Sequence, residues 1–453
     1  MFYGYVTYWF VFPMIVSAVV DFTAGRKIYQ SDSQKTKKRW MLASVAVNLL
    51  ILCFFKYTGW ASEITSEFFA AHFGIQVPVV TVPLPPGISF YTFQTMSYTL
   101  DIYRGQFIPE RSFVRYMAFV TFFPQLVAGP IERAKDLLPQ LAKKIALPEP
   151  AVFNKAFALV FWGLFVKLVF ADNFGGLVEL LQTKYIDPNR TLPPGWGLFY
   201  GYSFAYQIYC DFLAYTLIAR GVALLFNIKL QLNFLFPFVS SNASEFWQRW
   251  HISLSTWIRD YVYIPLGGSK YGSGRTLINV LATMFLSGLW HGAGPMYIVW
   301  GLYHGLLLIF YRFIPIHIIL DRVLGLILGR IFATFIFFQL GAIGWIFFRA
   351  APGDLSIIFS NILNFPVSEL VDDWWNLWTP PKNPTQWMTH VFLLYALPII
   401  TLDILAAVKK KSDHTELFVN LPWPIKTTVL IVSFYVLALF GARQENAFIY
   451  FQF

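Results

Sequence analysis

Two histidines are the residues of this chain whose type and setting best suit chemistry. His291 lies in residues 287–292 (SGLWHG), inside a stretch from 276 to 311 that carries no charged residue. His251 lies forty residues earlier, in a segment rich in tryptophan. A neutral imidazole has a pKa of about 6.5 and can therefore act as a general base at neutral pH. The reaction that it suits is removal of a proton from a hydroxyl group as that hydroxyl attacks an acyl carbonyl.

His291 differs from an ordinary core histidine in three respects. Gly288 and Gly292 flank it, so that another segment or a ligand can approach its backbone. It falls at a break between two apolar runs, and it follows the aromatic segment that carries His251. We therefore expect His291 to act at a reacting centre. His304, in residues 303–305 (YHG), is expected to be mainly structural.

Metal binding is the alternative use of these imidazoles. His251, His291 and His304 do not have the spacing of metal ligands, and no thiolate or carboxylate lies beside them in the sequence. Cys53 and Cys210 both lie in apolar runs, where we expect them to be buried as small hydrophobic residues without a disulfide. The sequence therefore predicts neither a bound metal nor a bound cofactor.

Three charged residues interrupt the apolar runs: Lys167, Asp211 and Asp403. A charge at the middle of a membrane costs about 2.5–3.5 kcal/mol on insertion scales, so each of them needs a partner or a reason. Lys167 and Asp403 are expected to pair with each other or to reach the membrane surface. Asp211, in residues 209–212 (YCDF), is expected to support the site or to contact substrate.

The composition narrows the class of protein that can hold these residues. Of the 453 residues, 57% are hydrophobic and 13% are charged, and the mean hydropathy is +0.55. Soluble domains carry roughly 25% charged residues. These values exclude a soluble multidomain enzyme, a disordered chain and a nucleic-acid binder. They indicate a polytopic membrane protein, in which the bilayer acts as the apolar solvent.

A spanning helix needs about 20 mostly apolar residues. The candidate segments are 1–20, 40–55, 84–100, 116–131, 156–171, 191–219, 276–290, 293–311, 331–348, 387–408 and 427–442. The first lacks the basic start and the cleavage site of a signal peptide, so it is expected to remain as a span. Segment 116–131 contains Pro124 and has basic residues on both sides, which predicts a re-entrant element. The sequence thus predicts one all-α polytopic membrane domain over residues 1–453, with ten to eleven spanning helices and re-entrant or dipping helices around a central tunnel.

The distribution of basic residues predicts the orientation, because lysine and arginine concentrate in cytoplasmic loops. Five segments hold 27 of the 34 lysines and arginines: 21–39, 101–155, 220–275, 312–330 and 409–426. They are predicted to be cytoplasmic, with the N-terminus outside. Segment 349–386 is acidic and rich in tryptophan, as expected at an outer interface. The net charge of +10 therefore reflects basic loops and not binding to nucleic acid.

Segment 231–275 is too polar to face lipid and too aromatic to lie free in water. Asn242 followed by Glu245 is a capping-box pattern, which predicts a helix from there to about Tyr261, ended by Pro265. On such a helix, His251 shares a face with residues 247, 254, 255 and 258. We expect this aromatic helix to dip into a cavity lined by protein and to carry His251 with it.

Two of these runs, 244–261 (SEFWQRWHISLSTWIRDY) and 287–292 (SGLWHG), resemble the hallmark segments of the membrane-bound O-acyltransferase (MBOAT) family. Further similar runs are 86–94 (PGISFYTFQ), 123–131 (FPQLVAGPI) and 448–453 (FIYFQF), so the resemblance covers nearly the whole chain. It implies a single MBOAT-type membrane domain.

Residues 263–270 (YIPLGGSK) resemble the alginate O-acetyltransferase (AlgI-like) branch of that family, whereas the related D-alanyl-transfer (DltB) branch normally lacks the Pro-Leu-Gly-Gly run. The chain departs from the AlgI-like branch around Asp211. Residues 211–217 are DFLAYTL, where that branch usually has DFSGYSD. The resemblance therefore leaves the acceptor open.

The resemblance implies an enzyme of the bacterial cytoplasmic (inner) membrane. Such an enzyme passes an acyl group, expected to be acetyl, from a cytoplasmic thioester such as acetyl-CoA or an acyl carrier through a tunnel to the outside. A periplasmic or extracellular acetyltransferase partner then modifies an exported polysaccharide such as alginate, with membrane lipids around the protein. The family's essential histidine falls on His291, and its second polar position falls on His251. Other residues expected to contact substrate are Trp250, Trp290 and Asp211, with Arg249, Arg259, Lys270 and Arg275 as candidates for the CoA phosphates.

Alternatives stay open at this point. D-alanyl transfer to teichoic acid and peptidoglycan O-acetylation could use the same relay. A lipid-carrier or glycan transporter is the rival of another class, because it would use the same cavity without making a bond. Inverted repeats would favour a transporter, and none is visible. A structural anchor for an extracytoplasmic complex would keep the fold without needing His291.

Overall fold

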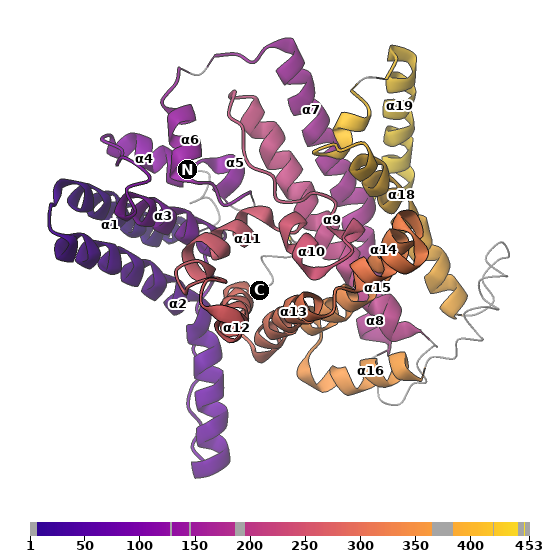
Figure 1. Cartoon of the computed structure of the whole chain (residues 1–453), viewed down its shortest axis with the longest axis horizontal. Coiled ribbons are helices and arrows are strands. Elements are labelled where there is room, and N and C mark those ends of the chain that lie inside the picture. Colours follow the sequence, from indigo (N-terminus) through magenta and orange to yellow (C-terminus); the bar gives the residue numbers. More distant parts are fainter. Residues whose placement is uncertain are drawn as a thin grey trace.

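The computed structural model describes residues 7–126, 129–144, 146–185, 195–364, 384–419, 421–442 and 448, and every regular element in these ranges is helical. Figure 1 shows α1 to α3 on one side of the molecule and α18 and α19 on the other, with α9 to α13 between them. The α-helices have the following bounds: Val11–Gln30 (α1), Gln34–Phe73 (α2), Ile88–Tyr103 (α3), Phe113–Val120 (α4), Phe123–Leu126 (α5), Ala134–Leu141 (α6), Pro150–Phe165 (α7), Asp172–Tyr185 (α8), Trp196–Leu224 (α9), Ala243–Arg249 (α10), Ile252–Ile258 (α11), Gly272–His291 (α12), Pro295–Phe313 (α13), Ile316–Leu324 (α14), Leu326–Arg349 (α15), Leu355–Leu363 (α16), Pro384–Val408 (α18) and Trp423–Phe440 (α19).

Among the described residues, seven helices are long and apolar enough to cross a membrane. They are Tyr8–Gln30, Gln34–Phe73, Pro150–Thr183, Pro295–Phe313, Leu326–Arg349, Gln386–Val408 and Trp423–Phe440. Each overlaps one of the predicted spans, which confirms the predicted class, a polytopic helical membrane protein.

Three further predicted spans correspond to α3, α9 and α12, although residues 191–194 lie outside the described part. α3 and α9 are buried along most of their length, so that other helices and not lipid surround them. A helix enclosed by protein can carry polar side chains that a lipid-facing helix cannot. This explains why α3 and α9 are less uniformly apolar than the seven helices given above as long and apolar enough to cross a membrane.

The predicted span 116–131 is not one continuous helix. α4 ends at Val120 and the four-residue α5 follows, while residues 127 and 128 lie outside the described part. Beyond them, the backbone N–H of Ile131 donates to the Ser253 hydroxyl at 3.0 Å, which attaches this segment to α11. A helix broken in this way is what a re-entrant element requires.

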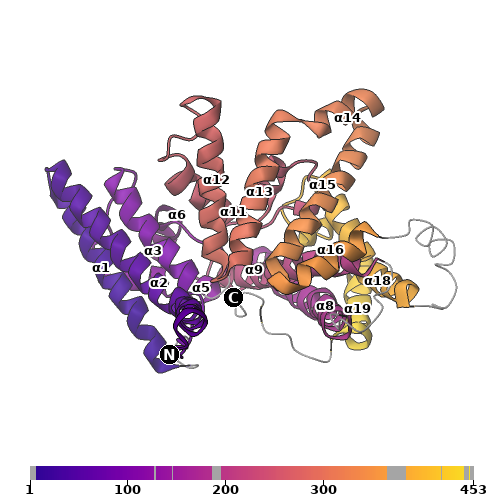
Figure 2. The same cartoon turned by 90° about the horizontal axis from the view of Figure 1, so that it is seen from below.

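α2 is 40 residues long, about 60 Å at 1.5 Å per residue, or twice the thickness of a bilayer core. Its two parts point in different directions, because Figure 2 shows the first part from the side and the last part end-on. Near the middle, the Thr58 hydroxyl donates to the Phe54 carbonyl at 2.6 Å, and Gly59 follows. Features of this kind bend helices. Only the first part of α2 therefore needs to cross the membrane, in agreement with the predicted span 40–55.

The predicted orientation is compatible with the arrangement of the helices. The turn between α1 and α2, the start of α12 and α14 all lie towards one edge of the molecule in Figure 2. They belong to segments 21–39, 220–275 and 312–330, which the distribution of basic residues places together on the cytoplasmic side. The start of α1 lies towards the opposite edge. Part of the predicted outer segment, 365–383, lies outside the described residues.

The first span extends beyond its predicted end at residue 20, because α1 continues through Asp21 to Gln30. Asp21 lies inside α1, not at its end, and is completely buried. Asn48 of α2 donates to the Asp21 carboxylate at 2.8 Å, and the Ser44 hydroxyl donates to the same oxygen. Asn48 accepts in turn from the Ser17 hydroxyl at 2.6 Å and from Thr95 of α3 at 3.2 Å. A buried carboxylate is tolerated here because these partners surround it, and the cluster joins α1, α2 and α3.

Substitution of Asp21 by alanine is expected to destabilise this three-helix unit. Ser44 and Asn48 would lose a charged acceptor, at about 1–3 kcal/mol for each buried group left without a partner. The midpoint of thermal unfolding, followed by tryptophan fluorescence in detergent, should fall by several degrees. Val19→Ala, at an exposed position of the same helix, is the control and should change the midpoint little. Equal midpoints for the two variants would contradict a stabilising role for the cluster.

Candidate functional site

The aromatic segment begins as predicted but is not a single helix. Asn242 caps α10, since its side-chain oxygen accepts from the Glu245 N–H at 2.9 Å. However, α10 ends at Arg249 and α11 begins at Ile252. The prediction that His251 shares a helical face with residues 247, 254, 255 and 258 is therefore wrong. His251 lies at the break between the two short helices.

The break holds His251 in an unusual backbone conformation. Its φ of 42° and ψ of 54° are left-handed, which is unfavourable for a residue with a side chain. Hydrogen bonds fix the backbone on both sides of it: Leu235 N–H donates to the Arg249 carbonyl at 3.0 Å, and Ile252 N–H donates to the Asn233 carbonyl at 2.9 Å. These bonds explain why the chain bends here although neither Gly nor Pro marks the position.

His291 is the last residue of α12, which packs closely against α13. A Cβ atom on Gly288 would lie 2.2 Å from the carbonyl oxygen of Tyr297, and one on Gly292 would lie 2.1 Å from the ring of Tyr297. The flanking glycines therefore admit another segment of the chain, one of the two possibilities that the sequence left open. Small residues allow membrane helices to approach each other closely. The contact fixes the direction in which α12 ends and so the position of His291.

Two side chains of α2 hold the end of α12. Lys56 Nζ donates to the carbonyl of His291 at 3.0 Å and also to the carbonyl of Trp290, and the Tyr57 hydroxyl donates to the carbonyl of Leu289. The last four carbonyls of a helix have no partner within the helix, and a cation near them also favours the helix dipole. Lys56 and Tyr57 are therefore positioning residues for His291. No local pattern in the sequence indicates this role, because Lys56 lies 235 residues away from His291.

The two histidines meet in the interior of the protein. Their ring centroids are 6.5 Å apart, and both side chains are buried. The ring of Trp290 lies 5.8 Å from that of His251 and 5.0 Å from that of His291. Trp300 contacts His291 from α13, with ring centroids 4.8 Å apart. The structure thus brings together the two histidines and Trp290, while their roles in a reaction remain a prediction.

Trp250 lies within the aromatic packing beside this site. It is completely buried, stacks on Phe246 at 5.5 Å and contacts Trp345 at 4.7 Å. His304 stacks on the same Phe246 ring at 6.0 Å, in keeping with a structural role.

Among the described residues, no three His, Cys, Asp or Glu side chains come together as a group that could hold a metal ion.

Asp211 is attached to the site through its neighbour in α9. Its carboxylate lies 2.8 Å from Lys167 Nζ, and Lys167 also binds Asp172 at 2.7 Å. Phe212, the next residue, has its ring 4.7 Å from that of His251. The ion pair therefore anchors the part of α9 that touches His251, which suits the predicted support role better than direct contact with substrate.

Lys167 and Asp403 do not pair with each other, which was one of the two predicted alternatives. Asp403 instead accepts from the Tyr209 hydroxyl at 3.0 Å and lies 2.7 Å from Nε2 of His414. Nδ1 of His414 accepts from the indole N–H of Trp162 at 3.0 Å, so Nε2 carries the proton that is donated to Asp403. Both buried charges have partners. Asp172 lies only five residues from Lys167, whereas Asp211 and Tyr209 come from α9, far away in the sequence.

The four basic candidates for a CoA phosphate differ in their surroundings. Arg249 is engaged within the protein, since its guanidinium lies 3.0 Å from Glu245 and donates to the Leu235 carbonyl at 3.0 Å. The side chain of Arg259 is 59% exposed and pairs with the adjacent Asp260 at 2.8 Å. Lys270 is exposed in the turn before α12, and Arg275 is exposed in the first turn of α12. The last three residues can meet an anion at the surface, whereas Arg249 would have to leave its partners.

Two arginines from distant segments, the exposed Arg104 and the buried Arg133, contact Tyr261 next to these basic residues. The guanidinium groups of Arg133 and Arg104 lie over the ring of Tyr261, at 4.4 and 4.8 Å from its centroid. Arg133 also pairs with Asp260 at 3.4 Å, 127 residues away in the sequence. In the sequence, both arginines are only basic residues of the loop 101–155, because nothing in their local pattern indicates this contact.

Comparison with known proteins identifies the family to which this chain belongs. Residues 2–344 match the model of the membrane-bound O-acyltransferase (MBOAT) family, and the chain belongs to this family. It is therefore an O-acyltransferase, and the resemblance found in the sequence is confirmed.

Named relatives narrow the comparison. The chain is 37% identical over 317 residues to a probable alginate O-acetylase AlgI of Pseudomonas aeruginosa, a match that covers 70% of this chain and 58% of that protein. A probable alginate O-acetylase AlgI of Pseudomonas putida is 32% identical over 436 residues, which is 92% of this chain and 85% of the relative. A peptidoglycan O-acetyltransferase of Helicobacter pylori is 29% identical over 484 residues, a match that covers 97% of this chain and 88% of that protein.

Substitution of Lys56 by methionine tests whether Lys56 positions His291. Without the ammonium group, the end of α12 can shift, and a displacement of about 1 Å can lower a rate by about 10²-fold. We expect kcat for acyl transfer to fall at least tenfold while KM for the acyl donor changes little, with partial rescue in Lys56→Arg. Lys38→Met, at the exposed start of α2, is the control and should keep the wild-type kcat. An unchanged kcat in Lys56→Met would contradict the positioning role.

Proposed function

We propose that this MBOAT enzyme transfers an acetyl group from a cytoplasmic thioester, acetyl-CoA or an acyl carrier, across the membrane for O-acetylation of a cell-surface or extracellular polysaccharide. The observation that carries the proposal is the meeting of His251 and His291, 6.5 Å apart in a buried aromatic setting. The names of the three relatives support it, because all three refer to O-acetylation.

The proposed chemistry is base-assisted acyl transfer. His291 takes the proton of the acceptor hydroxyl as the hydroxyl oxygen bonds to the acyl carbon. The carbon–sulfur bond of the thioester then breaks, and the departing thiolate takes up a proton, so that protons and charge balance. His251 donates a hydrogen bond to the acyl oxygen or holds the thioester end. In a site without bulk water, such fixed donors stabilise developing charge more strongly than they do in water.

The proposed path runs between the two faces of the membrane. Arg259, Lys270 and Arg275 meet the donor's phosphates at the cytoplasmic face, where an arginine fork suits a phosphate. If α3, α9 and α12 also cross the membrane, the seven apolar helices become ten, and the segment formed by α4 and α5 enters and leaves on one side. The two histidines then lie along a central tunnel enclosed by these helices.

The acceptor is the finer part of the proposal. An alginate-like polysaccharide, acetylated through an extracytoplasmic partner acetyltransferase, is favoured by the two AlgI relatives. Peptidoglycan is the second candidate, because the Helicobacter pylori relative aligns with 97% of this chain and residues 213–217 depart from the AlgI-like pattern. D-alanyl transfer to teichoic acid is disfavoured by the Pro-Leu-Gly-Gly run at 265–268. Mass spectrometry of the cell-surface glycans from a deletion strain would distinguish the three.

Replacement of His291 by alanine is expected to abolish acetyl transfer, lowering the rate by about 10²–10⁴-fold as for loss of a general base. The measurement is acetyl-CoA consumption by the purified, reconstituted protein together with the acetyl content of surface glycan in cells. His72→Ala, at the exposed end of α2, is the matched control and should leave both unchanged. Near wild-type transfer by His291→Ala would overturn the assignment. A protein that moves glycan without consuming acetyl-CoA would instead be the transporter.

His251 and His291 are expected to act as one unit. His251→Ala should lose most of the activity per folded molecule, and the double variant should lose little more, since groups that serve one step are not additive. Folded yield is measured in parallel by size-exclusion chromatography. If His251→Ala lowers only the yield, or if the losses multiply in the double variant, a shared step is excluded.

The orientation can be tested by cysteine labelling from outside the cell. Cys53 is exposed and not buried as predicted, so it is first replaced by alanine. In this background, a cysteine at the exposed Gly353 should react with a membrane-impermeant maleimide, whereas one at Lys410 should react only after the membrane is opened. Gly353 lies in the predicted outer segment 349–386, and Lys410 lies in the predicted cytoplasmic segment 409–426. The reverse labelling pattern would contradict the predicted orientation. The basic surface proposed to bind the thioester donor would then face away from the cytoplasm.

A further inference from the structure

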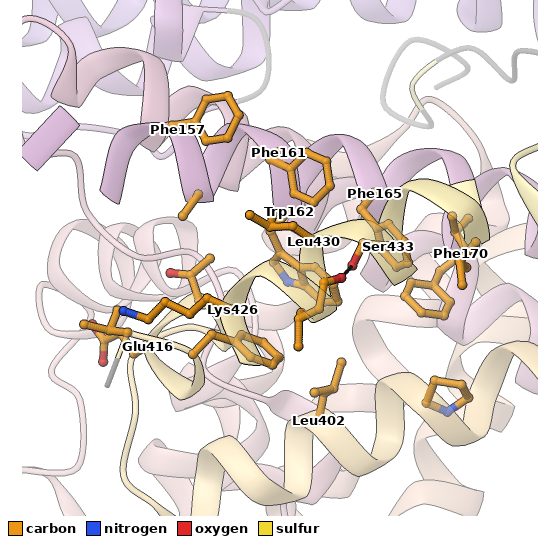
Figure 3. A pocket seen from close by; sticks show the side chains of 18 of the residues that line it. Phe157, Phe161, Trp162, Phe165, Phe170, Leu402, Glu416, Lys426, Leu430 and Ser433 are labelled. Atoms are coloured by element: carbon orange, nitrogen blue, oxygen red, sulfur yellow. Dashed lines mark hydrogen bonds between the residues drawn. The ribbon is translucent and has the colours of Figure 1, made fainter. Parts of the chain in front are cut away.

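A large apolar crevice lies between α7, α18 and α19, and neither His251 nor His291 lines it. Its volume is about 1120 Å³, which is above the roughly 300–1,000 Å³ of pockets for drug-sized ligands. Figure 3 shows Phe157 and Phe161 of α7 on one side of it and Leu402 of α18 on the other. The shape and lining suit a hydrocarbon chain rather than a polar metabolite.

α19 forms one wall of the crevice although none of its residues is buried within the protein. The side chains that it presents to the crevice, among them Leu430 and Ser433, follow each other at helical spacing. Water molecules in an apolar space of this kind find few hydrogen-bond partners. An acyl chain is stabilised there, because it leaves water and makes dispersion contacts with the aromatic rings of the lining. A chain in this position would add to the packing of α19, which already contacts α7 through the rings of Phe434 and Phe161, 5.3 Å apart.

One end of the crevice is positively charged. Lys155 at the start of α7, Lys411 after α18 and Lys426 at the start of α19 all contribute to its lining. Glu416 is the one acidic residue among the lining residues that the structure describes, and it pairs with Lys155 at 3.3 Å. Figure 3 shows Glu416 and Lys426 at one end of the pocket and Phe170 at the other. The crevice thus has a cationic head and an apolar body.

We propose that this crevice binds an anionic glycerophospholipid, with an acyl chain lying along α7, α18 and α19 and the headgroup phosphate among Lys155, Lys411 and Lys426. The excess of lysine over Glu416 selects an anionic headgroup over a zwitterionic one, since Lys near a membrane surface attracts anionic lipids. All three lysines belong to segments predicted to face the cytoplasm. Two walls of the site, α18 and α19, lie beyond residue 344, outside the part that matches the family.

The first test measures the lipid retained by the purified full-length protein. The protein is taken from vesicles of phosphatidylglycerol and phosphatidylethanolamine into mild detergent, and its bound lipid is analysed by native mass spectrometry. The wild type should retain phosphatidylglycerol in preference to phosphatidylethanolamine. The double variant Lys411→Gln/Lys426→Gln should bind phosphatidylglycerol more weakly by about fivefold for each lysine. Lys143→Gln/Lys144→Gln, which removes two exposed lysines that do not line the crevice, is the matched control and should match the wild type.

The second test fills the apolar body and leaves the charged head unchanged. Ser433→Trp places an indole in the crevice and should reduce retention of phosphatidylglycerol, whereas Val432→Trp, on a position of α19 that does not line the crevice, should not. Equal retention of the two lipids by the wild type, or unchanged retention in the double lysine variant, would overturn the proposal. Absence of any retained lipid from the wild type would also overturn it and would point to a protein helix as the occupant.

Discussion

Both histidines of the site lie where a helix stops inside a membrane protein, and this imposes the constraint on which the rest depends. Away from water, each backbone N–H or C=O that a broken helix releases needs a new partner. At His251 the partners are backbone groups of Asn233 and Leu235. At His291 the partners are the side chains of Lys56 and Tyr57. The positions of the two imidazoles therefore depend on segments that carry no chemistry themselves.

The features that the sequence could predict are local ones. Hydropathy located the seven apolar helices, because a lipid-facing helix must be apolar along its whole length. The cap at Asn242 was predictable because its partner, Glu245, lies three residues away. The two histidines were found because glycine, tryptophan and a charge-free stretch mark the region of His291, and because the surrounding runs resemble a known family.

The features that escaped prediction are set by contacts between distant segments. The break at His251 follows from backbone bonds to residues 233 and 235, which are arranged by the preceding loop and not by helix propensity. The first span was predicted to end at residue 20, just before Asp21, since a sequence cannot show that Asn48 and Ser44 will surround this carboxylate. The partner of Lys167 was not predictable for the same reason: Asp211 and Asp403 are equally plausible until α9 is placed beside α7.

The contact of Lys56 with the end of α12 also determines when the site can exist during synthesis. At about 5–20 residues per second, the ribosome needs roughly 12–47 s to reach His291 after it has made Lys56. Throughout that interval, the lysine has to be solvated by water, by lipid headgroups or by the insertion machinery. The carbonyls of α12 find their cation only when two units that entered the membrane at different times dock against each other. His291 is therefore placed by a late step of assembly, and a chain that inserts every helix correctly but fails to dock α2 would be a membrane protein without an active site.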